Sequence, residues 1–233
     1  MQYNVKYDSY GVSNWEQIYS GKEWPVLAFV GPPSGFPVDE QNAPLQRYLK
    51  WQDHIELKVT QFIATLPKGP FIGIHLRNGP DWARVCELVN DSSQLFSSPQ
   101  CLGYRNEFGR LTHEMCLPPV EIVIKQIKRG IKKIKATSVF VASDNNHLLP
   151  ELTSGLKKMG IEVRKLEEGE SSPHIDLAIL SKSNLFIGNC ISSFSAFVKR
   201  SRDVNSFPSE FWGFPPNMLG KDEANNNSVH EEL

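Results

Sequence analysis

The chain contains 233 residues, of which 40% are hydrophobic, and this is enough apolar material to fill the core of one large domain. Its formal net charge of −1 leaves no basic excess for counterion release, so neither nucleic acid nor an anionic membrane surface is an expected partner. No apolar run approaches the roughly 18 residues that a membrane span needs.

Residues 1–41 carry no pattern that would close a hydrophobic core. Tryptophans are scattered among polar residues, and only residues 26–30, Val-Leu-Ala-Phe-Val, have the composition of a strand. The start of the chain lacks the basic and apolar regions of a secretion signal. We interpret residues 1–41 as the remnant of an amino-terminal domain that begins upstream.

A long amphipathic helix is predicted over residues 42–66. Asn42 is a candidate N-cap, and Pro44 falls in the first turn, where proline is tolerated. The run Pro-Lys-Gly-Pro at residues 67–70 ends the helix. The side chains at helical spacing are Leu45, Tyr48, Leu49, Gln52, Ile55, Val59, Phe62, Ile63 and Leu66.

The next segment, residues 71–82, places charged chemistry at the end of a buried strand. An apolar run predicts a core strand, His75 and Arg77 lie at its carboxyl end, and Asn-Gly-Pro follows at once. Open α/β sheets bind ligands at the carboxyl ends of their strands, and a guanidinium binds phosphate or carboxylate groups bidentately. Taken alone, Arg77 contacts an anionic ligand or pairs with a neighbouring carboxylate.

Residues 78–118 are predicted to be largely irregular, with one short helix over 83–89. A stretch of this length inside a compact domain is usually functional or cross-linked. Three of the four cysteines fall here, and four cysteines allow three disulfide pairings, with buried free thiols as the alternative. The cysteines are Cys86, Cys101, Cys116 and Cys190.

Strands and helices alternate regularly after residue 119. This order predicts an α/β domain with a mostly parallel sheet and helices on both faces. The expected helices span residues 120–134, 146–159, 173–181 and 192–200, and the expected strands span residues 138–142, 161–166 and 184–188.

Further candidate binding residues lie in this part. Asp144 ends a predicted strand, where it faces a ligand or caps the next helix. Asp176 lies in the first turn of a predicted helix: its carboxylate suits the N1–H and N2–H₂ donors of guanine, or it interacts with the helix dipole. Ser192 and Ser193 start a helix directly after a strand, which suits a pyrophosphate or simple N-capping by Ser192.

Several other chemistries lack their sequence patterns. The chain contains no dinucleotide-binding or P-loop glycine pattern and no Gly-x-Ser-x-Gly nucleophile motif. It also contains no His-Glu-x-x-His, Cys-x-x-Cys or Asp-x-Asp pattern, so neither a structural zinc nor a carboxylate-bound metal is expected.

The end of the chain suggests a lumenal protein. We assign residues 203–233 to a carboxyl-terminal tail, whose last four residues, His-Glu-Glu-Leu at 230–233, resemble a retrieval signal of the endoplasmic reticulum lumen with Glu at the second position. Asn90 and Asn226 begin N-glycosylation sequons. A lumenal location requires that the full-length protein carry a signal peptide.

Five motifs can be read together: residues 75–82 (HLRNGPDW), 98–104 (SPQCLGY), 115–118 (MCLP), 175–179 (IDLAI) and 186–194 (FIGNCISSF). In this order and spacing they resemble the carboxyl-terminal part of the protein O-fucosyltransferase family, which uses GDP-fucose. The resemblance implies a GT-B fold of two Rossmann-like domains. This chain would hold the GDP-fucose-binding domain, residues 42–202, and an edge of the first domain.

The resemblance also implies the chemistry. Family members transfer fucose from GDP-fucose to Ser or Thr of EGF-like repeats, such as those of Notch, with inversion and without a metal or another cofactor. Arg77 is the implied catalytic residue, on the β-phosphate of the departing GDP, which suits a fixed cation where charge develops. The implied GDP-fucose contacts are His75, Arg77, Asp176, Ser192, Ser193 and Phe194.

The family's cysteine pairing would give Cys86–Cys116 and Cys101–Cys190 here. The first disulfide would fix the long loop, and the second would tie that loop to the predicted pyrophosphate-binding turn. Each closed loop would contribute roughly 2–4 kcal/mol to stability.

The chain departs from the family at Asn78 and Pro80, and it lacks the family's amino-terminal part with a loop that completes the active site. We therefore expect the 233-residue chain alone to be inactive or nearly so. Two alternatives remain: a non-catalytic module that binds GDP-sugars or acts as a chaperone for EGF-like repeats, and a fragment that misfolds.

Overall fold

Five strands form one sheet at the centre of the structure, a computed structural model that describes residues 19–26, 38–90, 92–170 and 172–214. The strand order is β3-β2-β1-β4-β5, and every neighbouring pair is parallel. The predicted parallel α/β sheet is thus confirmed. The strands are β1 (Phe71–Leu76), β2 (Ser138–Ser143), β3 (Glu162–Arg164), β4 (Leu185–Gly188) and β5 (Ser209–Phe211).

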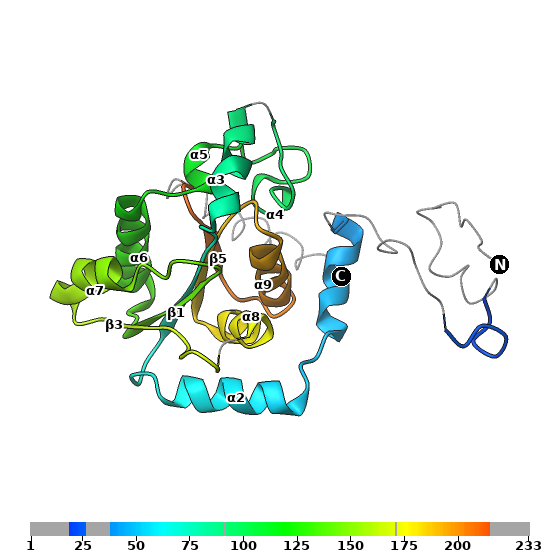
Figure 1. The fold of residues 1–233 in the computed structure, drawn as a ribbon, viewed down its shortest axis with the longest axis horizontal. Coiled ribbons are helices and arrows are strands. Elements are labelled where there is room, and N and C mark those ends of the chain that lie inside the picture. The colour runs from blue at the N-terminus through cyan, green and yellow to red at the C-terminus, as the bar shows by residue number, and fades with distance from the viewer. Residues whose placement is uncertain (1–18, 27–37, 91, 171, 215–233) are drawn as a thin grey trace, which may run out of the picture.

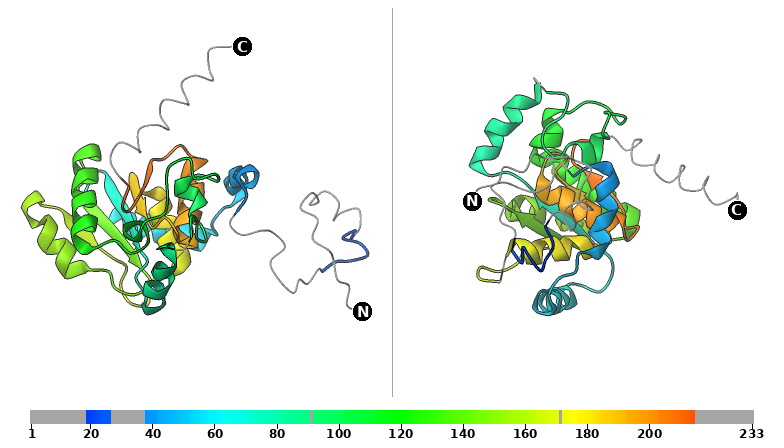
Figure 2. Two further views of the ribbon diagram at one scale, coloured as in Figure 1. Left: turned by 90° about the horizontal axis from the view of Figure 1, so that it is seen from above. Right: turned by 90° about the vertical axis from the view of Figure 1, so that its right-hand side faces the viewer.

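Helices cover both faces of the sheet (Figures 1 and 2). In Figure 1, α6 and α7 lie on one side, α8 and α9 lie on the other, and α2 lies beyond α8. In chain order they are η1 (Glu40–Tyr48), α2 (Asp53–Ala64), α3 (Pro80–Glu87), η2 (Leu88–Asn90), α4 (Pro99–Leu102), α5 (His113–Cys116), α6 (Val120–Ile134), α7 (Leu149–Leu156), η3 (Lys157–Met159), α8 (Pro173–Lys182) and α9 (Ser193–Asp203).

Strand β1 is buried along its whole length and divides the core in two. Ile72, Ile74 and Leu76 pack with α6 and α7, whereas Phe71 packs with α8 on the opposite face. Gly73 shares that second face, and a Cβ there would lie 2.9 Å from the Ser183 hydroxyl. The missing side chain therefore allows the end of α8 to approach the strand closely.

The single long helix predicted over 42–66 is wrong. The structure has the 3-10 helix η1 and the α-helix α2, separated by extended backbone at Leu49 and Gln52. Between them, the ring of Trp51 lies 5.7 Å from that of Phe197 on α9 and 6.2 Å from that of His174 on α8. Packing of this indole against two helices outweighs the helical periodicity of the segment.

The sheet extends past residue 202, where we expected the tail to begin. β5 pairs with β4, and Trp212 directly after it is fully buried. The expected features at 26–30, Asn226 and 230–233 lie wholly or largely outside the described residues. Within the described ranges, no helix is long and apolar enough to cross a membrane.

Candidate active site

The strand order places a topological switch point at the carboxyl ends of β1 and β4. The connection after β1 passes through α6 on one face of the sheet, whereas the connection after β4 passes through α9 on the other. Ligands of open α/β sheets bind at such a switch point, because the two connections leave the sheet toward opposite faces there. His75 lies in β1 and Arg77 directly follows it, whereas Ser192 is the N-cap of α9 and Ser193 its first residue.

His75 joins the two sides of this switch point. Its Nδ1 forms a 2.8 Å hydrogen bond with Ser195 Oγ on α9, and its ring centre lies 4.5 Å from that of Phe194. The indole N–H of Trp212 donates to the His75 carbonyl oxygen at 3.0 Å. Burial, reinforced by the positive charge of Arg77, lowers the pKa of His75 to about 3. The ring is therefore neutral at physiological pH.

A neutral buried His75 predicts acid sensitivity. The pKa rises from about 3 when folded to 6.5 when unfolded, so the unfolded chain binds more protons between these values. Stability therefore falls as the pH drops through this window, by about 2 kcal/mol from pH 7 to pH 5. Urea unfolding at both pH values measures the loss. His75→Gln should show a correspondingly smaller loss; an unchanged pH dependence in this variant would contradict the prediction.

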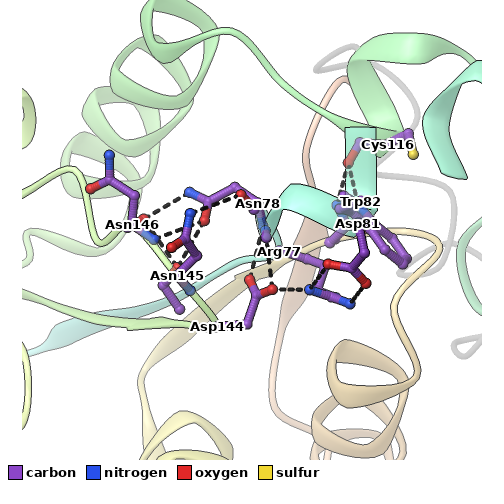
Figure 3. A network of polar contacts seen from close by, with 11 residues as sticks. Arg77, Asn78, Asp81, Trp82, Cys116, Asp144, Asn145 and Asn146 are labelled. Carbon is purple, nitrogen blue, oxygen red and sulfur yellow. Dashed lines mark hydrogen bonds and ion pairs between the residues drawn. The ribbon is translucent and has the colours of Figure 1, made fainter. Parts of the chain in front are cut away.

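Arg77, which directly follows β1, is held by the carboxylates of Asp81 and Asp144 (Figure 3). Its Nη2 pairs with Asp81 at 2.7 Å, its Nη1 pairs with Asp144, and its guanidinium lies 4.6 Å from the centre of the Trp82 ring. Hydrogen bonding from Arg77 lowers the pKa of Asp81. Arg77 keeps 23% of its side chain exposed, so part of the guanidinium side chain remains accessible. Of the two roles expected for Arg77, pairing with a carboxylate is observed, and contact with an anionic ligand stays a prediction.

The turn between β4 and α9 is organised by Asn189, which is fully buried. Its Oδ1 accepts the N–H groups of Ile191 and Ser192 at 3.0 and 3.2 Å, and its own N–H donates to Ser195 Oγ at 2.9 Å. Its Nδ2 donates to the carbonyl oxygen of Cys116 at 2.6 Å. This side chain shapes the turn in which the sequence predicts a pyrophosphate site.

Simple N-capping does not account for Ser192. It occupies the N-cap position of α9, yet its hydroxyl makes no capping hydrogen bond. The first N–H groups of a helix have no acceptor within it, and α9 begins at the carboxyl edge of the sheet. Ser193 is exposed and Phe194 is half-buried, so this helix start has an exposed hydroxyl beside the first N–H groups of α9.

The disulfides match the expected pairing, Cys86–Cys116 and Cys101–Cys190. Gln100 Nε2 also donates to the carbonyl oxygen of Cys190 at 2.8 Å. In this way the loop before α6 is attached to the turn after β4. Residues 78–118 were expected to be largely irregular with one helix over 83–89, but they form the short helices α3, η2, α4 and α5. Cys101–Cys190 holds this segment against the turn after β4.

Asp176 lies at the same edge of the sheet. Helix α8 ends just before β4 enters the sheet, so its first turn lies at the carboxyl side, where α9 also begins. Ser172 caps α8 by accepting the N–H of Ile175 at 3.3 Å. Ile175 and Phe194 belong to the apolar cluster on this face of the sheet, where α8 and α9 pack against each other.

Sequence reasoning missed Asn189 and Ser195, and left the role of Asp144 open. Asp144 does not cap a helix; it accepts the backbone N–H groups of Asn78 and Gly79 at 2.9 and 3.0 Å. An asparagine directly after a strand is typical of such turns, and this was the available signal for Asn189. Among the described residues, no cluster of three or more His, Cys, Asp or Glu could hold a metal ion, and metal independence stays a prediction.

Comparison with known proteins gives a consistent result. The sequence profile described as GDP-fucose protein O-fucosyltransferase matches residues 2–205. A Caenorhabditis elegans protein, GDP-fucose protein O-fucosyltransferase 1, is 39% identical over 204 residues, covering 85% of this chain and 52% of the relative. The chain thus spans about half the length of this curated relative.

Solved structures agree. The crystal structure of POFUT1 in complex with GDP-fucose superposes with a TM-score of 0.79 at 39% identity, covering 87% of this chain and 58% of that one. A complex of POFUT1 with GDP gives a TM-score of 0.78 at 39% identity, with coverages of 86% and 60%. These matches confirm the expected GT-B-type fold class.

Proposed function

The chain belongs to the GDP-fucose protein O-fucosyltransferase family, and we propose on this basis that it forms the GDP-fucose-binding part of a peptide O-fucosyltransferase. One observation carries the proposal. Arg77 after β1 and the turn after β4 lie on the two sides of the switch point, linked by His75 through Phe194 and Ser195. A cation and a helix start at one switch point together suit a nucleoside diphosphate.

Arg77 is the proposed catalytic residue. As an acceptor hydroxyl attacks C1 of fucose, the C1–O bond to the β-phosphate breaks and its electron pair passes to the departing GDP, while the hydroxyl proton passes to solvent water. The guanidinium stabilises the charge that develops on the phosphate, and a fixed cation needs little reorganisation to do so. Attack on the face opposite GDP inverts C1, and Arg77 supplies the positive charge without a metal.

Calorimetric titration of the 233-residue chain with GDP, GDP-fucose and UDP tests the proposal. We expect GDP and GDP-fucose to bind with similar affinity, because both present the same diphosphate and base. UDP should bind more than tenfold less tightly, since the base contacts are lost. The proposal fails if GDP and UDP bind equally, or if neither binds.

Asp176 is the proposed reader of guanine. Its carboxylate accepts hydrogen bonds and cannot donate, which matches the N1–H and N2–H₂ groups of the base. Asp176→Asn is therefore expected to reduce the preference for GDP over inosine diphosphate, which lacks the 2-amino group, by about tenfold. Competition titrations with the two nucleotides measure this. An unchanged preference in Asp176→Asn would assign guanine recognition to other groups.

We further propose the acceptors and the compartment. The substrates are Ser or Thr of EGF-like repeats, Notch among the parent proteins, and the site of action is the endoplasmic reticulum lumen. Two disulfides support an oxidising compartment. Asn90 is exposed, as a glycosylation acceptor must be. Its use would appear as a mass shift that peptide N-glycosidase removes.

The second candidate is a non-catalytic module that binds GDP-sugars or acts as a chaperone for EGF-like repeats. The chain's coverage of only 52% of its curated relative favours this alternative for the chain alone. A transfer assay with GDP-fucose and a folded EGF-like domain separates the two functions. Fucose transfer by the purified chain would exclude the non-catalytic interpretation.

A further inference from the structure

We propose that Asn78 is a positioning residue, whose side-chain amide fixes the loop carrying Arg77 to the loop after β2 and so sets the direction of the guanidinium. The inference rests on the proposed function, because it concerns how Arg77 is presented to the diphosphate. Asn78 follows Arg77 directly and is half-buried.

The side-chain amide of Asn78 acts both as a hydrogen-bond donor and as an acceptor (Figure 3). Its Nδ2 donates to the carbonyl oxygen of Asn146 at 2.7 Å, and its Oδ1 accepts the N–H of the same residue at 3.0 Å. The hydroxyl of Ser143 lies within hydrogen-bond distance of the same Oδ1, at 3.2 Å, and of the carbonyl oxygen of Asn146, at 3.0 Å. One side chain thereby pairs with a backbone segment as a neighbouring strand would.

This pairing requires a carboxamide. It needs a donor and an acceptor on one planar group, and among side chains of this length only asparagine carries both in fixed geometry. An aspartate at position 78 would keep the acceptor, but would place a carboxylate oxygen against the carbonyl of Asn146. Alanine would leave the N–H of Asn146 without its partner, and the carbonyl oxygen of Asn146 would keep only the Ser143 hydroxyl.

The loop after β2 also holds Arg77, through Asp144. Its carboxylate accepts the N–H groups of Asn78 and Gly79 and pairs with the guanidinium, so one loop fixes both the backbone and the side chain of the arginine segment. Asp81 holds the guanidinium from another direction. Asn78 does not touch the guanidinium, so its effect on Arg77 is transmitted through the loop.

Loss of the Asn78 hydrogen bonds should therefore weaken the binding only of nucleotides that carry a β-phosphate. The experiment compares GDP with GMP, which lacks that phosphate, in calorimetric titrations of the full 233-residue chain. In Asn78→Ala and Asn78→Asp, we expect the ratio of GMP to GDP dissociation constants to fall about fivefold. The affinity for GMP itself should stay within about twofold, because base and α-phosphate contacts do not depend on this loop.

Asn205→Ala is the matched control. The exposed side chain of Asn205 donates one hydrogen bond to the Ser201 carbonyl oxygen at 2.7 Å, on the last turn of α9. The substitution is the same, and we expect the ratio to stay at the wild-type value. Thermal unfolding of each variant identifies any general loss of folding, which would reduce both nucleotide affinities together.

The outcomes separate this inference from the proposed function. If the wild-type chain does not prefer GDP over GMP, the phosphate site itself is wrong and the inference falls with it. If the wild-type preference depends on Arg77 but is unchanged in both Asn78 variants, the positioning role alone is overturned. Equal losses for GDP and GMP would also overturn it, because they indicate a structural role only.

Discussion

Replacing Arg77 by alanine is expected to weaken GDP binding about 100-fold while changing GMP affinity by no more than about threefold. Arg77 supplies a cation at the switch point. A bidentate hydrogen-bonded contact between a guanidinium and a phosphate is among the stronger polar interactions in a binding site. Removing it costs the β-phosphate contact and leaves the paired carboxylates of Asp81 and Asp144 facing the diphosphate. Isothermal titration with both nucleotides measures the effect.

Two control variants make this result specific. Arg77→Lys retains the charge without the planar fork and should recover only part of the loss. Arg164 ends β3 at the same edge of the sheet and pairs with Glu162 at 2.8 Å, but lies two strands from β1. Arg164→Ala should leave GDP affinity within about twofold. Equal losses in Arg77→Ala and Arg164→Ala would indicate general electrostatic attraction rather than a phosphate site.

The sequence predicted the central fold because its pattern there is governed by burial. Residues 120–134 coincide with α6, whose apolar positions repeat at helical spacing, and the strand expected at 138–142 is β2 to within one residue. β5 was missed because it is only three residues long and includes Glu210, which is 3% exposed and paired with Arg129. A buried, paired carboxylate cannot be distinguished from a surface one by composition.

The candidate site was predictable in its charged and hydroxyl-bearing residues, but not in the amides that hold them. His75 was recognisable because a polar residue ended an apolar strand. Asn78 and Asn189 act through backbone groups of Asn146 and Cys116, which are remote in sequence. Those partners are set by strand order and loop packing, so periodicity carries no information about them.

The disulfides connect stability to this arrangement, and removing Cys101–Cys190 by double serine substitution is expected to have the largest effect on folding. The bridge closes a segment with a sequence separation of 89, and its loss should lower the free energy of unfolding by roughly 4.5 kcal/mol in the chain-entropy description. Total stabilities of about 5–15 kcal/mol make this a large fraction. Urea unfolding at constant pH, with the slope checked for two-state behaviour, measures the change.

Cys86–Cys116 provides the matched comparison within the same loop. Its sequence separation is 30, so its double serine variant should lose roughly 3.5 kcal/mol, about 1 kcal/mol less. A reversed order would contradict the entropic explanation and point to local strain or packing. The two variants should differ in a second way: Cys190 follows Asn189 in the turn at the switch point, so loss of its bridge should also weaken GDP binding. Loss of stability without loss of GDP affinity in the Cys101–Cys190 variant would show that the hydrogen bonds of Asn189 and Gln100 hold the turn unaided.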